Sequence, residues 1–216
     1  MLDHRAKLAE LRAAIARHQS SPARAFAGLL ETGVPALDFP LDGGLPKGGM
    51  IELVCPTGRA GASTMMAALL RQRASRNQWS ALIDGGDQFD AQGAGAAALS
   101  RLLWVRCHTA REAFRAADLL LRDANLPLIL FDLRGCSEKE LRQVPSTTWY
   151  RFQRLLEPAS VALLALTSSP QMPCALVRLE VDSVFGLEAL EEEAETLVTR
   201  CHASASRQAK ANYVQA

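Results

Sequence analysis

Residues 56–63, with the sequence PTGRAGAS, form the stretch in which the chain could hold a phosphate. They follow a short apolar run and precede an alanine-rich segment, which is the layout of the phosphate-binding pattern G-x-x-x-x-G-K-[ST]. When the pattern is aligned on Gly61, Pro56 takes the place of its first glycine, Ala62 that of its lysine, and Ser63 keeps the hydroxyl. The sequence therefore predicts the frame of a phosphate site without its principal cation.

Two other side chains could take part in such a site. Arg59 offers a cation within the loop, and Asp132 follows an apolar run, as an aspartate that helps to hold Mg²⁺ would. A turn or helix-capping role is the open alternative for Asp132. Losing the lysine removes a charge-assisted contact worth about 1.5–3 kcal/mol. The candidate nucleotide-binding residues are then Arg59, Gly61, Ser63 and Asp132. They form a degenerate site from which we expect no catalysis and no bound cofactor, with ATP and Mg²⁺ as the alternative.

Composition limits the other classes of function. Basic and acidic residues nearly balance, at 24 and 23, so net charge gives no support for nucleic-acid binding. The five cysteines and four histidines show no metal-ligand spacing, which predicts reduced thiols and no metal site. Cys55 lies beside the candidate loop and could be a reactive thiol or a packed one. No apolar segment is long enough to cross a membrane and the first residues do not resemble a signal peptide, so we expect a cytoplasmic protein.

The rest of the chain alternates between apolar runs and helical patterns. Expected strands cover residues 50–54, 79–84, 101–106, 126–131 and 161–166, and expected helices cover residues 62–76, 90–100, 109–124 and 145–156. This order predicts an α/β fold with a mostly parallel, twisted sheet flanked by helices. Ligands of such sheets bind beyond the carboxyl ends of the strands, where residues 56–61 and 132–135 would meet.

The two ends of the chain lie outside this alternation. Residues 2–19 predict a helix with a narrow apolar stripe of Leu8, Leu11 and Ile15, which could dock on its own domain, on a partner or on a second copy. An edge strand is expected at residues 175–181, an acidic helix at 187–201 and a frayed tail beyond it. We therefore divide the chain into an N-terminal helix (1–22), an α/β core (23–186) and a C-terminal acidic helix with a flexible tail (187–216).

Several of these segments together resemble the core of the RecA superfamily. The carrying residues are 32–64 (TGVPALDFPLDGGLPKGGMIELVCPTGRAGAST), followed in the same order by SALIDGGDQFD, LLWVRCHTAREAFRAADLLL and LPLILFD. The resemblance spans roughly residues 32–168 and implies a RecA-like fold. It also places Gly86 where the family carries the glutamate that polarises the attacking water. Both the lysine and this acid are missing, so the resemblance favours a protein without ATPase activity.

RecA proteins also carry two mobile loops that contact DNA. The first would correspond to residues 133–145, in which Arg134, Lys139 and Arg142 are possible DNA contacts beside Glu138 and Glu140. The second would be residues 167–174, which hold no basic or aromatic side chain. The resemblance thus implies at most weak or indirect binding of nucleic acid.

Within the superfamily the chain resembles the ImuA-like branch, which groups with SulA-like relatives and has degenerate ATP motifs. This branch implies a non-catalytic adaptor in DNA-damage-induced mutagenesis (translesion synthesis), with an ImuB-like polymerase homologue, an error-prone polymerase and RecA as partners. Leu8, Leu11 and Ile15 would then be contact residues, and the N-terminal helix could also mediate self-association. Two alternatives stay open: a SulA-like division inhibitor or modulator of RecA filaments, and an ATP-binding switch with an altered P-loop.

Overall fold

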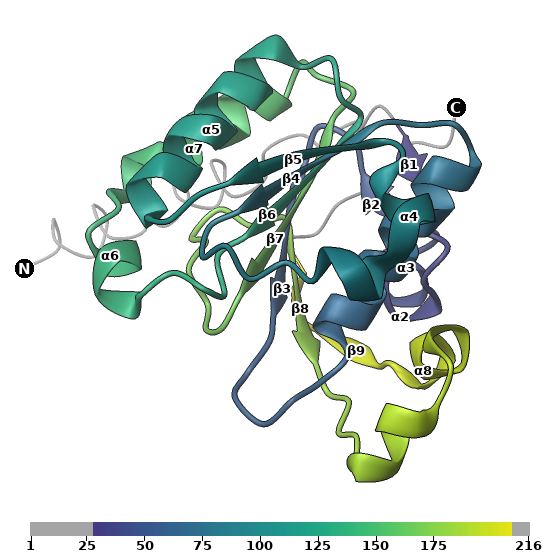
Figure 1. Cartoon of the computed structure of the whole chain (residues 1–216). Helices are drawn as coiled ribbons and strands as arrows, with labels where there is room; N and C mark the ends of the chain where they lie inside the picture. The colour runs from purple at the N-terminus through teal and green to yellow at the C-terminus, as the bar shows by residue number, and fades with distance from the viewer. Residues whose placement is uncertain (1–27, 209–216) are drawn as a thin grey trace, which may run out of the picture.

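A seven-stranded sheet forms the centre of the computed structural model, which describes residues 28–208 (Figure 1). Its strands lie in the order β5-β4-β6-β7-β3-β8-β9; all neighbours pair in parallel except β8 and β9, which are antiparallel. The strands are β3 (Met50–Val54), β4 (Ser80–Asp84), β5 (Leu102–Arg106), β6 (Leu128–Asp132), β7 (Ala162–Thr167), β8 (Val177–Val181) and β9 (Ala203–Gln208). A separate antiparallel pair joins β1 (Leu29–Leu30) to β2 (Leu45–Pro46).

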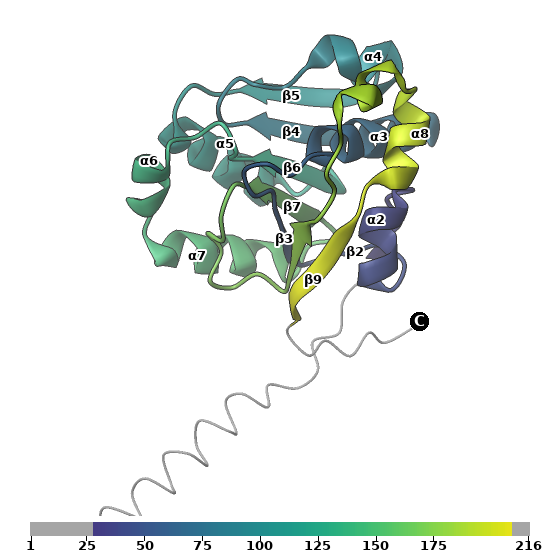
Figure 2. The ribbon, with the colours of Figure 1, turned by 90° about the horizontal axis from the view of Figure 1, so that it is seen from below.

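Helices cover both faces of the sheet (Figures 1 and 2). One face carries α2 (Pro35–Asp38), α3 (Ala62–Ser75), α4 (Ala91–Leu99) and α8 (Ala194–Arg200). The other face carries α5 (Ala110–Asp123), α6 (Glu138–Arg142) and α7 (Ser146–Leu156). Two 3-10 helices, η1 (Phe39–Leu41) and η2 (Leu187–Glu191), complete the described elements. The fold class predicted from the sequence, a mostly parallel α/β sheet between helices, is confirmed and is consistent with a RecA-like core.

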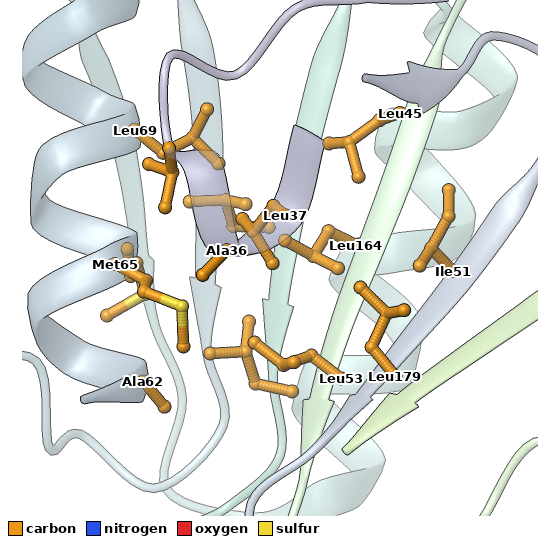
Figure 3. Close-up of a cluster of buried hydrophobic side chains, with 14 of the residues drawn as sticks. Ala36, Leu37, Leu45, Ile51, Leu53, Ala62, Met65, Leu69, Leu164 and Leu179 are labelled. Atoms are coloured by element: carbon orange, nitrogen blue, oxygen red, sulfur yellow. The ribbon is translucent and has the colours of Figure 1, made fainter. Parts of the chain in front are cut away.

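The central strands correspond to continuous apolar runs in the sequence because strands buried on both faces need apolar side chains on both sides. Every residue of β3, β4, β6 and β7 is buried. Figure 3 shows side chains from α2, α3 and the sheet in the layer between them, where Leu37, Met65 and Leu69 belong to one buried cluster with Leu53 and Leu164. Against the opposite face, Phe114, Phe131, Trp149 and Phe152 pack with ring centroids 4.9–6.5 Å apart.

Helix α5 begins where the sequence predicts. The hydroxyl of Thr109 accepts a hydrogen bond from the Glu112 N–H at 3.2 Å, and the Glu112 carboxylate accepts one from the His108 N–H at 2.9 Å. The first of these bonds satisfies an amide that a helix leaves unpaired at its start, and the second fixes the residue before the N-cap. Helix α4, by contrast, is kinked at Gly95, whose positive φ of 81° interrupts the helical backbone.

Several expectations for the loops and the C-terminal region are wrong. Residues 133–145 contain helix α6, capped by Ser137. Strand β8 is not at the edge, because β9 pairs with it and takes the edge itself. The acidic helix expected at residues 187–201 is divided into η2 and α8, and residues 203–208 of the expected frayed tail form β9. The C-terminal part of the chain is therefore part of the sheet as far as Gln208.

The two ends of the chain lie outside the residues that the structure describes. The N-terminal helix expected at residues 1–22, with Leu8, Leu11 and Ile15, lies outside the described residues, as does the tail beyond residue 208. Among residues 28–208, the structure contains no helix with the length and apolar character needed to span a membrane.

The connections that follow β3 and β6 leave the carboxyl ends of their strands toward opposite faces of the sheet. From β3 the chain passes to α3 on one face, whereas from β6 it passes to α6 and α7 on the opposite face. Ligands of parallel α/β sheets bind beyond the carboxyl ends of strands whose connections diverge in this way. The loop between β3 and α3 and the turn after β6 both lie at this end of the sheet, where Arg134 donates to both Ser63 and Asp132.

Candidate functional site

The loop between β3 and α3 has the glycine-bearing turn of a phosphate-binding loop, but two of its backbone N–H groups donate to carbonyls of the protein. Gly58 and Gly61 have positive φ angles of 82° and 105°, which glycine adopts without strain. Pro56 has no N–H to offer, and its carbonyl accepts the Arg59 N–H at 3.0 Å. The Ala60 N–H donates to the Ser183 carbonyl, also at 3.0 Å. These two amides are therefore engaged within the protein rather than directed at a phosphate.

The C-terminal segment covers this loop. Besides the Ala60–Ser183 hydrogen bond, the Arg59 guanidinium donates to the Asp182 carbonyl at 3.1 Å. A Cβ atom at Gly61 would lie 2.8 Å from the Cys201 sulfur, so the segment leaves no room for a side chain there. Burial raises the pKa of the Cys201 thiol to about 11, and the thiol is therefore protonated. Arg59 thus binds the end of β8 and is not brought together with Ser63 and Asp132.

Ser63 and Asp132 do meet, but through a third residue. Asp132 ends β6 and is 4% exposed, and its carboxylate accepts two hydrogen bonds from the Arg134 guanidinium, at 2.9 Å from Nε and 2.6 Å from NH2. The remaining nitrogen of the same guanidinium, NH1, donates to the Ser63 hydroxyl at 3.1 Å. A fixed cation thus lies between the hydroxyl and the carboxylate, the two groups that hold Mg²⁺ in P-loop enzymes.

The electrostatics of this cluster keep the cation in place. Burial alone would lower the pKa of Arg134, but the hydrogen bonds and the negative charge of Asp132 outweigh it, and the pKa is raised. The planar guanidinium fits the carboxylate with two parallel hydrogen bonds, a geometry that lysine cannot reproduce. A second cation at the same point would be repelled. The residues present therefore do not fit Mg²⁺ between Ser63 and Asp132, and with Ala62 in place of lysine they do not fit the phosphates of ATP.

Cys55, at the start of the loop, is a packed thiol. Burial raises its pKa to about 12, although the nearby charge of Arg134 acts in the opposite direction. A thiol with this pKa is protonated at neutral pH, and only the thiolate is an effective nucleophile. Of the two interpretations left open by the sequence, the structure favours the packed residue.

Gly86, the position at which the RecA resemblance would place a catalytic acid, has no space for a side chain. A Cβ atom at Gly86 would lie 2.4 Å from the Cα atom of Gly135, so the turns after β4 and β6 are in direct backbone contact. The Gly85 N–H also donates to the Asp132 carbonyl at 2.8 Å. Asp84, which is 1% exposed, accepts hydrogen bonds from the Gln88 and Phe89 N–H groups and so holds the first turn closed. The two turns pack where a water-activating glutamate would need room.

The three possible DNA contacts do not form one basic surface. Arg134 points inward to Asp132, which contradicts its expected place on a DNA-contacting loop. Arg142 pairs with Glu138 at 2.6 Å on the exposed side of α6, where Lys139 is also exposed. In the second loop, the Gln171 and Met172 N–H groups donate to the buried carboxylate of Glu52, at 2.6 and 3.2 Å. One loop is thus partly helical and the other is attached to the core.

Sequence reasoning missed the partners that fill the site. The segment from Asp182 to Cys201 carries no motif that would place it against the loop. The contact of Arg134 with Asp132 could have been suspected from the sequence, because an arginine two residues after a strand-terminal aspartate can bind back to it. The same spacing also fits an arginine that is exposed to solvent. Among the described residues, no group of three or more His, Cys, Asp or Glu side chains could hold a metal ion.

Comparison with known proteins adds no relative. No protein-family model matches the chain, and a search of the curated proteins gives no match.

Proposed function

We propose that the protein is a non-hydrolysing, RecA-like accessory protein of the ImuA-like type, which acts through protein contacts in DNA-damage-induced mutagenesis. The observation that carries the proposal is the guanidinium of Arg134 between Ser63 and Asp132. The chain keeps both polar groups of a metal–nucleotide site and joins them with its own cation. In this proposal the cluster stabilises the end of β6 and the start of α3, and the outer surfaces of the protein carry the function.

The surface between α5 and α7 has the properties that a protein partner would need. It forms a groove of about 670 Å³ whose lining includes Phe114, Leu119, Val144 and the cations Arg111 and Arg115. Leu119 is 68% exposed. Within residues 28–208, Arg111 and Arg115 make no ion pair, unlike Arg151, which pairs with Asp118 at 3.0 Å. Unpaired cations beside apolar side chains fit an acidic amphipathic helix.

The first prediction concerns nucleotide binding. Titration of the full chain with ATP and Mg²⁺ by calorimetry is expected to show no binding tighter than a Kd of about 1 mM, because the phosphates lack a lysine and the metal position holds Arg134. A Ser63→Ala variant serves as the control, since it removes the hydroxyl without leaving a buried charge. Micromolar binding that weakens on Ser63→Ala would contradict the proposal and favour the nucleotide switch.

The second prediction concerns partners. Purified ImuB-like protein, error-prone polymerase and RecA would each be tested for binding to the full chain by biolayer interferometry. Combining Arg115→Glu with Leu119→Asp is expected to weaken binding by at least about 30-fold, the effect of removing an interface hot spot. Leu187→Asp is the matched control, because Leu187 is 84% exposed in η2, away from α5 and α7.

The same measurement separates the groove from the N-terminal residues. Leu11→Asp with Ile15→Asp tests the expected contact residues that lie outside the described part of the chain. If both pairs of changes leave the affinity for all three proteins unaltered, neither surface is the docking site. Binding to RecA alone would contradict the adaptor role and favour a modulator of RecA filaments.

A further inference from the structure

Arg73, in the last turn of α3, is a buried arginine whose Nε–H has no acceptor among residues 28–208. The residue is only 5% exposed, and its Nε atom is buried without a hydrogen-bond partner. No ion pair or side-chain hydrogen bond joins Arg73 to any other residue of the range 28–208. A guanidinium that is removed from water without an anion is unfavourable, so an anionic group is needed to compensate its charge.

Its surroundings increase the positive charge instead of compensating it. Arg73 lines a cavity of about 300 Å³ together with Lys47, Arg76 and Glu31. Arg76 already binds the Glu31 carboxylate at 2.8 Å, which leaves that acid committed. Burial, and to a lesser degree the charge of Arg76, lower the pKa of Arg73. The cavity therefore contains three cations and one carboxylate, a net of two positive charges.

The dipole of helix α3 favours arginines near its C-terminus, but it does not provide a hydrogen-bond acceptor for Arg73. Cations near the C-terminus of a helix are stabilised by its partial negative charge. That interaction is diffuse and supplies no acceptor to the buried Nε–H of Arg73. The cavity has the size of the smaller ligand sites in proteins, and arginine binds oxyanions with two parallel hydrogen bonds.

From these contacts we propose that the cavity between β1, β2 and the end of α3 is a binding site for a phosphate group, held by Arg73, Arg76 and Lys47. A phosphate carries up to two negative charges at neutral pH, which matches the net charge of the lining better than one carboxylate does. The site is at the opposite end of α3 from Ser63, since Arg73 lies in the last turn of the helix and Ser63 in the first. It is therefore independent of the degenerate nucleotide site.

The test measures thermal unfolding of the full chain at fixed ionic strength. Raising inorganic phosphate from 1 to 50 mM in place of chloride is expected to raise the Tm by about 4 °C more in the wild-type protein than in Arg73→Met. Arg71→Met is the matched control on the same helix, with the same net charge as Arg73→Met, and it should retain the full response. This comparison removes the general stabilising effect of phosphate on folded proteins.

A second readout does not depend on the folding of Arg73→Met and uses the conservative variant Arg73→Lys only to assign a signal. In ¹H–¹⁵N spectra of the wild-type protein, the Arg73 Nε–H signal, identified by its loss in Arg73→Lys, should shift on addition of phosphate. Glycerol phosphate in a parallel titration distinguishes a phosphate monoester from the free ion. Equal Tm responses in the wild-type protein and Arg73→Met, or an Arg73 signal that does not move, would overturn the proposal. An acetate response as large as the phosphate response would overturn the assignment to a dianion.

Discussion

Asp132→Ala is expected to lower the free energy of unfolding by about 3–5 kcal/mol, the usual cost of removing one partner from a buried ion pair. The side chains of Asp132 and Arg134 are 6% and 22% exposed, so the guanidinium would be left largely out of water with no carboxylate. The change would also remove the acceptor of the Arg134 N–H, which lies 3.1 Å from the Asp132 carboxylate. Urea unfolding at pH 7 measures the loss as a lower midpoint at a constant slope.

A double-mutant cycle separates the lost pair from the unpaired charge. Asp132→Ala combined with Arg134→Met should recover most of the lost stability, because the second change removes the charge that the first leaves unpaired. Glu138→Ala is the control on an exposed ion pair, that with Arg142, and should cost no more than about 0.5 kcal/mol beyond its effect on helix α6. A cost below about 1 kcal/mol for Asp132→Ala would mean that solvent screens the Arg134 cation, contrary to the fixed position proposed for it.

The Arg134 cluster gives Ser63 and Asp132 a structural role, which agrees with the non-hydrolysing function proposed above. In a P-loop enzyme the serine and the aspartate are held apart by a metal that comes and goes with the nucleotide. Here the same two groups are joined permanently by a side chain of the protein, so their contribution is to stability. Gly86 is in backbone contact with Gly135, so an acidic side chain could not be placed there without separating the two turns.

The sequence was sufficient to predict the strands and helices whose apolar side chains are continuous or periodic along the chain. Strands β3, β6 and β7 are apolar runs buried on both sides, and α5 has one apolar face with a capping residue at its start. Such patterns predict structure reliably because the apolar side chains that create them are the ones that form the core. The site residues Ser63 and Asp132 were located for the same reason, since each is adjacent to such an element.

The C-terminal region could not be predicted because its structure depends on partners distant in the sequence. Residues 203–208 read ASASRQ, which has no apolar alternation, and they form β9 because β8 offers unpaired backbone groups at its side. The acidic run after Gly186 is divided into η2 and α8, since adjacent glutamates repel one another and no continuous apolar face holds a long helix together. The direction of Arg134 was open for a similar reason, because its partner Ser63 is 71 residues away.

Glu52→Ala should have an effect as large as Asp132→Ala, about 3–5 kcal/mol of unfolding free energy. The Glu52 side chain is 0% exposed in the middle of the sheet, where it pairs with Arg178 of β8 at 2.7 Å. Its carboxylate also accepts the Thr167 hydroxyl at 3.1 Å and two N–H groups of the loop after β7. Removing it leaves a mostly buried guanidinium and these donors without an acceptor. Unfolding in urea measures the loss, and adding Arg178→Met to Glu52→Ala should recover part of it.

The same substitution tests the state of the loop at residues 168–176. In the wild-type protein the Gln171 and Met172 amides should be strongly protected from hydrogen exchange, because both donate to Glu52 and Met172 is fully buried. Glu52→Ala should lower their protection more than that of the β6 amides, which would register only the general loss of stability. Rapid exchange at these two amides in the wild-type protein would show a mobile loop instead. A loop fixed in this way cannot rearrange around DNA without breaking the Glu52 contacts, which is why the proposed function relies on the outer helices and not on this segment.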